Sequence, residues 1–229
     1  MLFRWIALAA VLAALPDRLM AMQKVDIELV LAVDVSGSVD GVEQDLQRRG
    51  LSGAFRDVAV IDAITALPDG LAVALVAWAG VDEQRTLIAW HRLTDAASAM
   101  QFADLIDGAL PVDLGSSPYT ALGDALIWSL AELARNGYAG RGKIDVSGDG
   151  RNNCGEYPQP VRDRAVADGV TINGLAILNE DPYLTNFYQR SVIGGPGAFV
   201  LEAADYASFT EAMRRKLLRE LAIGPIAVR

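Results

Sequence analysis

The sequence is poor in the residues that several classes of protein depend on. Its 229 residues contain one cysteine and one histidine, Cys154 and His91. A single cysteine excludes a disulfide within the chain, and a single histidine leaves few choices for a general base. Lys and Arg number 20 against 29 Asp and Glu, a net charge of −9. This balance argues against a nucleic-acid partner, because phosphate backbones attract clustered cations.

Long apolar runs are also scarce. Arg4 precedes a run from Trp5 to Leu15, which is too short to cross the roughly 30 Å of bilayer hydrocarbon as a relaxed helix. The pattern predicts a signal peptide over residues 1–21, cleaved after Ala21, and an uncleaved anchor is the alternative. No later segment is long and apolar enough to span a membrane. We therefore expect an exported chain, periplasmic or secreted, with no transmembrane segment in its mature part.

The remaining sequence, 52% hydrophobic overall, is long enough for one compact domain over residues 25–222. Apolar or alternating runs predict strands that are interleaved with amphipathic stretches of helical periodicity. We expect strands at 25–33, 71–78, 85–90, 143–147, 171–178 and 199–201, and helices at 40–55, 95–106, 120–136, before Asp168 and at 205–221. This alternation predicts a doubly wound, three-layer α/β/α domain with a mainly parallel sheet and one antiparallel edge strand.

Oxygen-bearing side chains follow three of the predicted elements. Asp34, Ser36 and Ser38 come directly after the first strand, Thr120 opens a helix, and Asp149 follows a later strand. In sheets of this class ligands collect at the carboxyl ends of the strands, near the point where strand order reverses. Hydroxyl and carboxylate oxygens suit hard cations, so we predict a divalent-metal site, most plausibly for Mg²⁺, with Mn²⁺ or Ca²⁺ as alternatives.

The pattern D-x-S-x-S, a distant Thr, and an Asp-Gly after a strand resembles the metal-ion-dependent adhesion site of von Willebrand factor type A domains. The phrases DVSGSVD, IDVSGDGRNN, TINGLAI and VIGGPGAF also resemble a bacterial exported family of unknown function with this fold. The resemblance implies that Ser36 and Ser38 hold the ion directly, that Thr120 does so directly or through water, and that Asp34 and Asp149 act largely through water. It further implies a protein partner that supplies an acidic group to the ion.

One residue of this pattern has a competitor. The usual Thr-Asp-Gly is replaced by Ser-Gly-Asp-Gly at 147–150, so Asp145 is an alternative to Asp149. We prefer Asp149, because Asp145 falls within a strand and is expected to face a core or a helix, where it needs a partner. The D-x-S-x-S motif alone also fits a helix cap and turn, and its position between strand and helix is what favours a metal.

Three hypotheses for function follow from these residues. The first is a metal-dependent binding or adhesion module without enzymatic activity. The second is a metal-assisted hydrolase of the cell envelope, which would need a base; His91 lies in the predicted edge strand and there is no G-x-S-x-G nucleophile motif. The third is a fold that keeps the motif only to stabilise its loops. The sequence names neither the partner nor the biological process.

Overall fold

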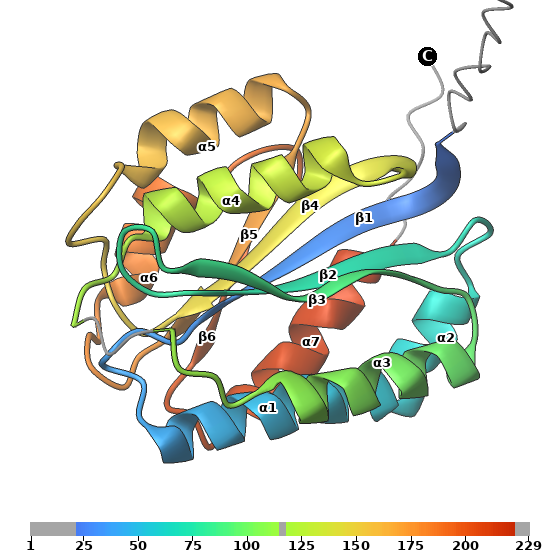
Figure 1. The fold of residues 1–229 in the computed structure, drawn as a ribbon, viewed down its shortest axis with the longest axis horizontal. Coiled ribbons are helices and arrows are strands. Elements are labelled where there is room, and N and C mark those ends of the chain that lie inside the picture. Colours follow the sequence, from blue (N-terminus) through green and yellow to red (C-terminus); the bar gives the residue numbers. More distant parts are fainter. Residues whose placement is uncertain (1–21, 115–117, 223–229) are drawn as a thin grey trace, which may run out of the picture.

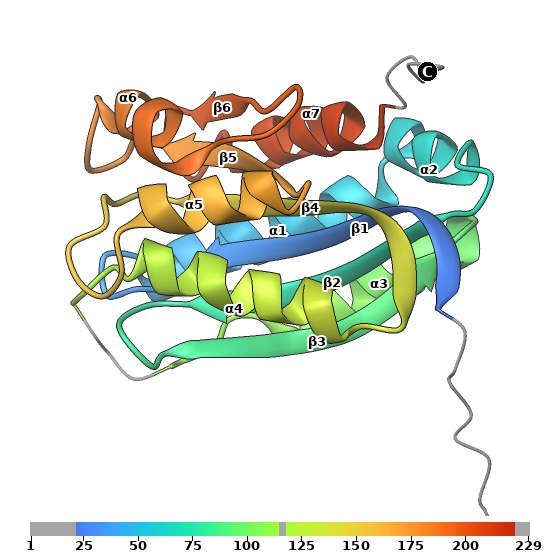
Figure 2. The same cartoon turned by 90° about the horizontal axis from the view of Figure 1, so that it is seen from above.

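The computed structural model describes residues 22–114 and 118–222, where the chain forms one six-stranded sheet (Figure 1). Figure 2 shows its strands in the order β3-β2-β1-β4-β5-β6. All neighbouring strands are parallel except β2 and β3, which form an antiparallel edge. The fold class predicted from the sequence is therefore confirmed. The strands are β1 (Gln23–Asp34), β2 (Leu71–Trp78), β3 (Gln84–Leu93), β4 (Tyr138–Gly148), β5 (Thr171–Ile177) and β6 (Val200–Ala203).

Helices cover both faces of this sheet. One face packs against a layer that contains α1, α2, α3 and α7, and the other against a layer that contains α4, α5, α6 and a single π-helical turn, η1 (Figure 1). Successive side chains of each strand enter alternate layers, as the pleat requires. The helices are α1 (Gly41–Arg56), α2 (Val58–Thr65), α3 (Ala96–Ala109), α4 (Leu122–Arg135), α5 (Pro158–Ala167), α6 (Leu184–Phe187), η1 (Tyr188–Val192) and α7 (Phe209–Leu221).

Two of these helical segments were not predicted. The predicted helix at 40–55 is α1, but a second helix, α2, follows it at once. Asp57 separates the two, because its backbone is extended and its side chain caps α2 by accepting hydrogen bonds from the backbone of Ala59 and Val60. Segment α6–η1 was also missed. Strand β4 starts five residues earlier than the predicted 143–147, since its first part pairs with the beginning of β1. The predicted signal segment, 1–21, lies outside the described residues.

The start of α1 fixes the direction in which the chain leaves β1. Asp40 is the N-cap: its carboxylate accepts hydrogen bonds from the backbone of Val42 and Glu43, and Glu43 accepts one from the backbone of Asp40 in return. This capping box satisfies amide groups that the helix leaves open. The loop between Asp34 and Asp40 is thus held at both ends.

No helix within 22–114 and 118–222 is both long and apolar enough to cross a bilayer. The apolar strands are instead buried inside the domain: every residue of β2 is buried, as its continuous apolar sequence predicts for a central strand.

A buried group of charges lies where α7 packs on the sheet. Lys216 of α7 forms ion pairs with Asp145 of β4, at 2.7 Å, and with Glu220 one turn along, at 3.2 Å. Asn173 of β5 donates a hydrogen bond of 2.7 Å to Glu220, and Lys143 lies 3.3 Å from the same carboxylate. Since Lys216, Asp145 and Glu220 are almost fully buried, each charge depends on its partners.

Replacing Lys216 by methionine should leave the buried Asp145 without its cation and Glu220 with Lys143 alone. Loss of one member of a buried pair costs about 3–5 kcal/mol, so we expect a clearly lower midpoint in urea unfolding. Arg214→Met is the matched control, because Arg214 pairs with Glu211 on the exposed side of the same helix and should change stability little. Equal midpoints for Lys216→Met and the parent protein would contradict this account.

Candidate metal centre

The site begins where β1 ends. Asp34 is the last residue of this buried strand, and its carboxylate accepts a hydrogen bond of 2.8 Å from the backbone amide of Ser36. This bond turns the chain away from the sheet direction. From α1, the buried amide of Gln47 donates a bond of 3.0 Å to the Asp34 carbonyl oxygen. The Asp34 side chain is therefore fixed at the sheet edge.

A chain of polar contacts runs from this loop to the loop after β4. The hydroxyl groups of Ser36 and Ser38 are 3.2 Å apart, and the Ser38 hydroxyl donates a hydrogen bond of 2.9 Å to Asp149. Ser38 and Asp149 are 111 positions apart in the sequence. The strand order explains the contact, because β1 and β4 are neighbours whose carboxyl ends lie at the same edge of the sheet.

Thr120 comes from the third loop and faces the same point. Its backbone amide donates to the side chain of Asn153, at 2.8 Å, and its carbonyl oxygen accepts from the Asn153 amide, at 3.0 Å. A Cβ atom on Gly150 would lie 3.3 Å from the Thr120 hydroxyl, so the loop after β4 passes directly beside it. Asn152 adds a bond to the backbone of Gly123 in α4. The structure thus brings all five sequence-predicted residues together.

Asp145, the alternative to Asp149, lies elsewhere. It sits inside β4, its side chain is on the α7 face, and Lys216 neutralises it. Asp149 is the carboxylate that contacts Ser38. The departure from the usual Thr-Asp-Gly therefore does not move the carboxylate out of the group, because Ser147 and Gly148 still belong to β4 and Asp149 is the first residue beyond it.

The two site carboxylates are buried and incompletely compensated. Asp34 and Asp149 have no exposed surface, and one oxygen of each, Oδ2, has no hydrogen-bond partner among residues 22–114 and 118–222. Within the described part of the chain, neither forms an ion pair with a Lys or Arg. Burial, and next the nearby Asp149, raise the pKa of Asp34 to about 7; burial is also the main cause that raises the pKa of Asp149. These are carboxylates that a cation would stabilise.

The donor set fits a hard divalent cation. Three hydroxyl groups and two carboxylates converge from three loops, all through oxygen, which is the ligand type that Mg²⁺ and Ca²⁺ take. No cluster of three or more His, Cys, Asp or Glu side chains with metal-binding geometry exists among residues 22–114 and 118–222. The site is therefore distinguished from common zinc or carboxylate-cage sites by its dependence on Ser and Thr.

Two tyrosines under the site escaped the sequence analysis. The hydroxyl group of Tyr188, in η1, is buried and has no hydrogen-bond partner in the described part of the chain. Both this hydroxyl and Asp34 Oδ2 lie within about 3 Å of a Cβ built on Gly148. Tyr206 follows β6, and its hydroxyl approaches Asp149 without the geometry of a hydrogen bond. Burial, and then the charge of the nearby carboxyl groups, raises the pKa of both tyrosines, so these hydroxyls stay neutral. No motif marks them: Tyr188 comes from an unpredicted element, and Tyr206 lies in the loop before α7, although the helix was predicted to start at residue 205.

His91 is remote from this site. It lies in β3 opposite Val73, near the amino end of β2, whereas Asp34 lies opposite Trp78 at the carboxyl end. Its Nδ1 atom is 2.7 Å from the Ala89 carbonyl oxygen. The only histidine of the sequence therefore contributes nothing to the five-residue group.

Comparison with known families gives one match that spans nearly all of the described chain. A family model described as a protein of unknown function, DUF1194, matches residues 24–224. No curated protein matches the sequence.

Solved structures with a similar fold include several von Willebrand factor type A domains. Proximal thread matrix protein 1 from the mussel byssus has a TM-score of 0.62 at 17% identity, over 86% of this chain and 47% of its own. A further structure of that protein has zinc in its metal-ion-dependent adhesion site, with a TM-score of 0.60 at 14% identity, over 87% and 48% of the two chains. The pilus adhesin SpaC from Lactobacillus rhamnosus GG has a TM-score of 0.60 at 12% identity, over 86% of this chain and 31% of its own.

A von Willebrand factor type A protein from Catenulispora acidiphila has a TM-score of 0.55 at 17% identity, over 86% of this chain and 42% of its own. The chain thus spans about half of the mussel protein and less of the other two. At these identities the likeness establishes the fold, and it agrees with the resemblance inferred from the D-x-S-x-S pattern.

Gly148→Ala tests how closely the site is packed. The new Cβ would lie 2.7 Å from Asp34 Oδ2 and 3.0 Å from the Tyr188 hydroxyl, so Asp34 must shift. Overpacking of this kind costs about 1–3 kcal/mol, and we expect lower stability together with weaker Mg²⁺ binding by calorimetry. Gly108→Ala in α3 is the control, because its Cβ meets nothing within 4 Å. Unchanged Mg²⁺ affinity in Gly148→Ala would show that Asp34 does not belong to the site.

The pH dependence of metal stabilisation follows from Asp34. Its pKa is raised from 3.8 to about 7 in the folded, metal-free protein. Between these values the folded state retains a proton that the unfolded state has lost, so metal-free stability falls as the pH rises. A divalent cation binds the ionised carboxylate, and we expect the thermal shift caused by Mg²⁺ to grow from about pH 5 to about pH 8. Asp34→Asn should flatten this dependence, and a shift independent of pH would contradict it.

Proposed function

Since this chain belongs to the DUF1194 family of proteins of unknown function and has the fold of von Willebrand factor type A domains, we propose that it is an exported module that binds a protein partner through a divalent cation. The observation that carries the proposal is the unpaired oxygen on each of the two buried carboxylates, Asp34 and Asp149, beside the linked hydroxyls of Ser36 and Ser38. Their charge has no compensation from Lys or Arg in the described chain.

Each of the five residues has a defined part in the proposed site. Ser36, Ser38 and Thr120 would hold the cation through hydroxyl oxygens, while Asp34 and Asp149 would orient those hydroxyls and bound waters. The cation would supply a Lewis-acidic position for an acidic group of the partner. We propose Mg²⁺ as the preferred ion, because the donors are all oxygens, and the zinc-occupied site of the mussel protein makes Zn²⁺ a required comparison.

The surface around the site supports a protein partner. Three exposed tyrosines, Tyr119, Tyr157 and Tyr183, come just before α4, α5 and α6, which places them on the loops at the carboxyl edge of the sheet. Their exposed fractions are 57%, 73% and 67%. Tyrosine is enriched at protein interfaces because its ring gives a large contact area and its hydroxyl a hydrogen bond. The pilus adhesin and the byssus matrix protein among the similar structures agree with a binding role.

The proposal assigns no catalysis to the chain. His91 is at the opposite edge of the sheet, and the tyrosine hydroxyls next to the site stay neutral. A metal-assisted hydrolase and a purely structural motif are therefore the two alternatives that the following experiment must separate. Export rests on the predicted signal segment, 1–21, and fractionation of the native cells checks it.

The double variant Ser36→Ala, Ser38→Ala removes two proposed ligands without adding bulk. We expect the thermal shift with Mg²⁺ to disappear, because two of three hydroxyl donors are lost. Ser98→Ala is the control: its hydroxyl takes part in the capping box of α3, so it should lower stability but keep the Mg²⁺ shift. A parent protein that responds to none of Mg²⁺, Mn²⁺, Ca²⁺ and Zn²⁺ would leave only the structural role.

Partner binding is tested with the parent protein immobilised in Mg²⁺ and eluted with chelator. We expect a protein that is retained in Mg²⁺, released by chelator and absent from the double serine variant. Amidation of the partner's carboxyl groups should abolish retention, since the cation is proposed to bind an acidic group. Metal-dependent hydrolysis of envelope material that the double variant lacks would instead establish the enzyme, and retention in chelator would refute metal-dependent binding.

A further inference from the structure

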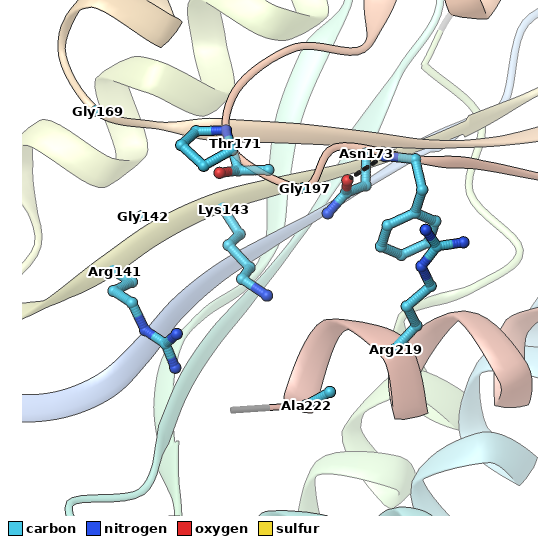
Figure 3. A pocket seen from close by; sticks show the side chains of 11 residues that line it. Arg141, Gly142, Lys143, Gly169, Thr171, Asn173, Gly197, Arg219 and Ala222 are labelled. Carbon is cyan, nitrogen blue, oxygen red and sulfur yellow. Dashed lines mark hydrogen bonds between the residues drawn. The ribbon is translucent and has the colours of Figure 1, made fainter. Parts of the chain in front are cut away.

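A second polar site lies at the other end of the sheet, away from the metal centre. A cavity of about 380 Å³ opens where β4 and β5 begin and α7 ends (Figure 3). Arg141 and Lys143 contribute to it from β4, Thr171 and Asn173 from β5, and Arg219 from α7. Lys143 pairs with Thr171 in the sheet register, so these side chains share the face that α7 covers.

The charge of the lining is opposite to that of the whole protein. The chain has a net charge of −9, yet the described residues that line this cavity include three basic side chains and no Asp or Glu. Figure 3 shows Arg141 and Lys143 with their nitrogen atoms directed toward the end of α7 that carries Arg219 and Ala222. The net negative charge of the protein repels anions in general. A local cluster of cations therefore indicates a specific site for an anionic ligand.

The buried carboxylates beneath the cavity do not neutralise all the basic side chains that line it. Asp145 and Glu220 are balanced by Lys216 and Lys143, so two negative charges face two positive ones. The backbone carbonyl groups at the end of α7 carry only a partial negative charge, roughly half a unit. Lys143 already donates a hydrogen bond to one of them, the carbonyl oxygen of Glu220. Arg141 and Arg219 remain as surplus, and within the described chain neither forms an ion pair with a carboxylate.

The two arginines keep donors free for a ligand. The guanidinium of Arg219 lies 4.0 Å from the centroid of the Phe199 ring, which occupies one face of the group and leaves its N–H edge open. Arg141 donates one bond of 3.3 Å to the Asp26 carbonyl oxygen and has further N–H groups. Like-charge repulsion from Arg141 and Lys216 contributes, after burial, to a lowered pKa of Lys143, and a bound anion would relieve it.

The lining also leaves room for a ligand between these donors. Among residues 22–114 and 118–222, nothing lies within 4 Å of a Cβ built on Gly169 or Gly197, so this part of the chain leaves both positions unobstructed. The Asn173 side chain is held in place by bonds to the Phe199 amide and to Glu220. The pocket thus combines fixed polar walls with unpaired arginine donors.

We propose that this cavity binds a phosphate group through Arg141 and Arg219, independently of the metal centre. A tetrahedral dianion accepts several charge-assisted hydrogen bonds at once and matches the planar fork of arginine. The source is either inorganic phosphate or a small phosphomonoester, and the volume admits both.

Calorimetry and thermal unfolding of the full chain in chelator, at constant ionic strength, test this site with inorganic phosphate and with glycerol phosphate. We expect saturable binding that becomes about tenfold weaker or more in Arg141→Gln, Arg219→Gln, because each charge-assisted bond contributes at least that factor. Arg85→Gln is the matched control, since Arg85 is an exposed arginine of the edge strand β3. Should the double variant fail to fold, the single variant Arg219→Glu replaces it.

The tighter of the two compounds shows whether the cavity prefers inorganic phosphate or a phosphomonoester. The double serine variant of the metal centre must bind phosphate normally, which separates this site from the proposed function. Absence of binding by both compounds, or equal binding by the parent and the arginine double variant, would overturn the proposal.

Discussion

The structure at the carboxyl edge of the sheet depends on two buried carboxylates placed close together. Asp34 and Asp149 end neighbouring strands, and the fold brings them into the same dry environment without a Lys or Arg partner among the described residues. Like charges in such a place raise each other's pKa and lower stability unless a cation or a proton neutralises them. The surrounding loops are built around this constraint: backbone amides and serine hydroxyls contact one oxygen of each carboxylate and leave the other open.

Strand β4 and the residue after it carry two buried carboxylates whose charges are compensated in different ways. Asp145 and Asp149 are four residues apart, and both are buried. Asp145 faces α7, where Lys216 supplies a permanent positive charge at 2.7 Å. Asp149 lies beyond the end of the strand, and among the described residues the hydroxyl of Ser38 is the side-chain group that donates a hydrogen bond to it. Compensation is internal and fixed in the first case; in the second, the proposed cation would supply it from solution.

The sequence predicts the parts of this structure that depend on local pattern. Continuous apolar residues identified β2 with its observed bounds, and the alternation of strands and helices gave the correct class. The proximity of the five oxygen-bearing residues could be predicted because each lies at or just beyond the end of a recognisable element, and chain topology brings such ends together; their role as a metal site stays a prediction. The preference for Asp149 over Asp145 also followed from local reasoning, since a carboxylate inside a strand must find a partner within the fold.

What could not be predicted depends on contacts distant in sequence. Helix α2 follows α1 after a single residue, so the hydrophobic pattern gives no gap between them, and the capping role of Asp57 is visible only in its backbone conformation. Tyr188 reaches Asp34 from a π-helical turn, whose periodicity differs from that of an α-helix. The partner of Asp145 is a lysine 71 positions later, on a helix whose sequence does not show which strand it packs against.

The proposed cation would change how an acidic ligand meets this edge of the sheet. With a net charge of −9, the chain repels an acidic partner at long range, although salt screens this repulsion beyond about 8 Å at physiological ionic strength. A cation held mainly by neutral hydroxyls would keep more of its positive charge than one held in a carboxylate cage. It would therefore be a local point of attraction on a repelling surface, so that association depends on the metal and not on the overall charge of the protein. A hydrolase would in addition need a group that accepts a proton near neutral pH at the reacting centre, and the only histidine lies at the opposite edge of the sheet.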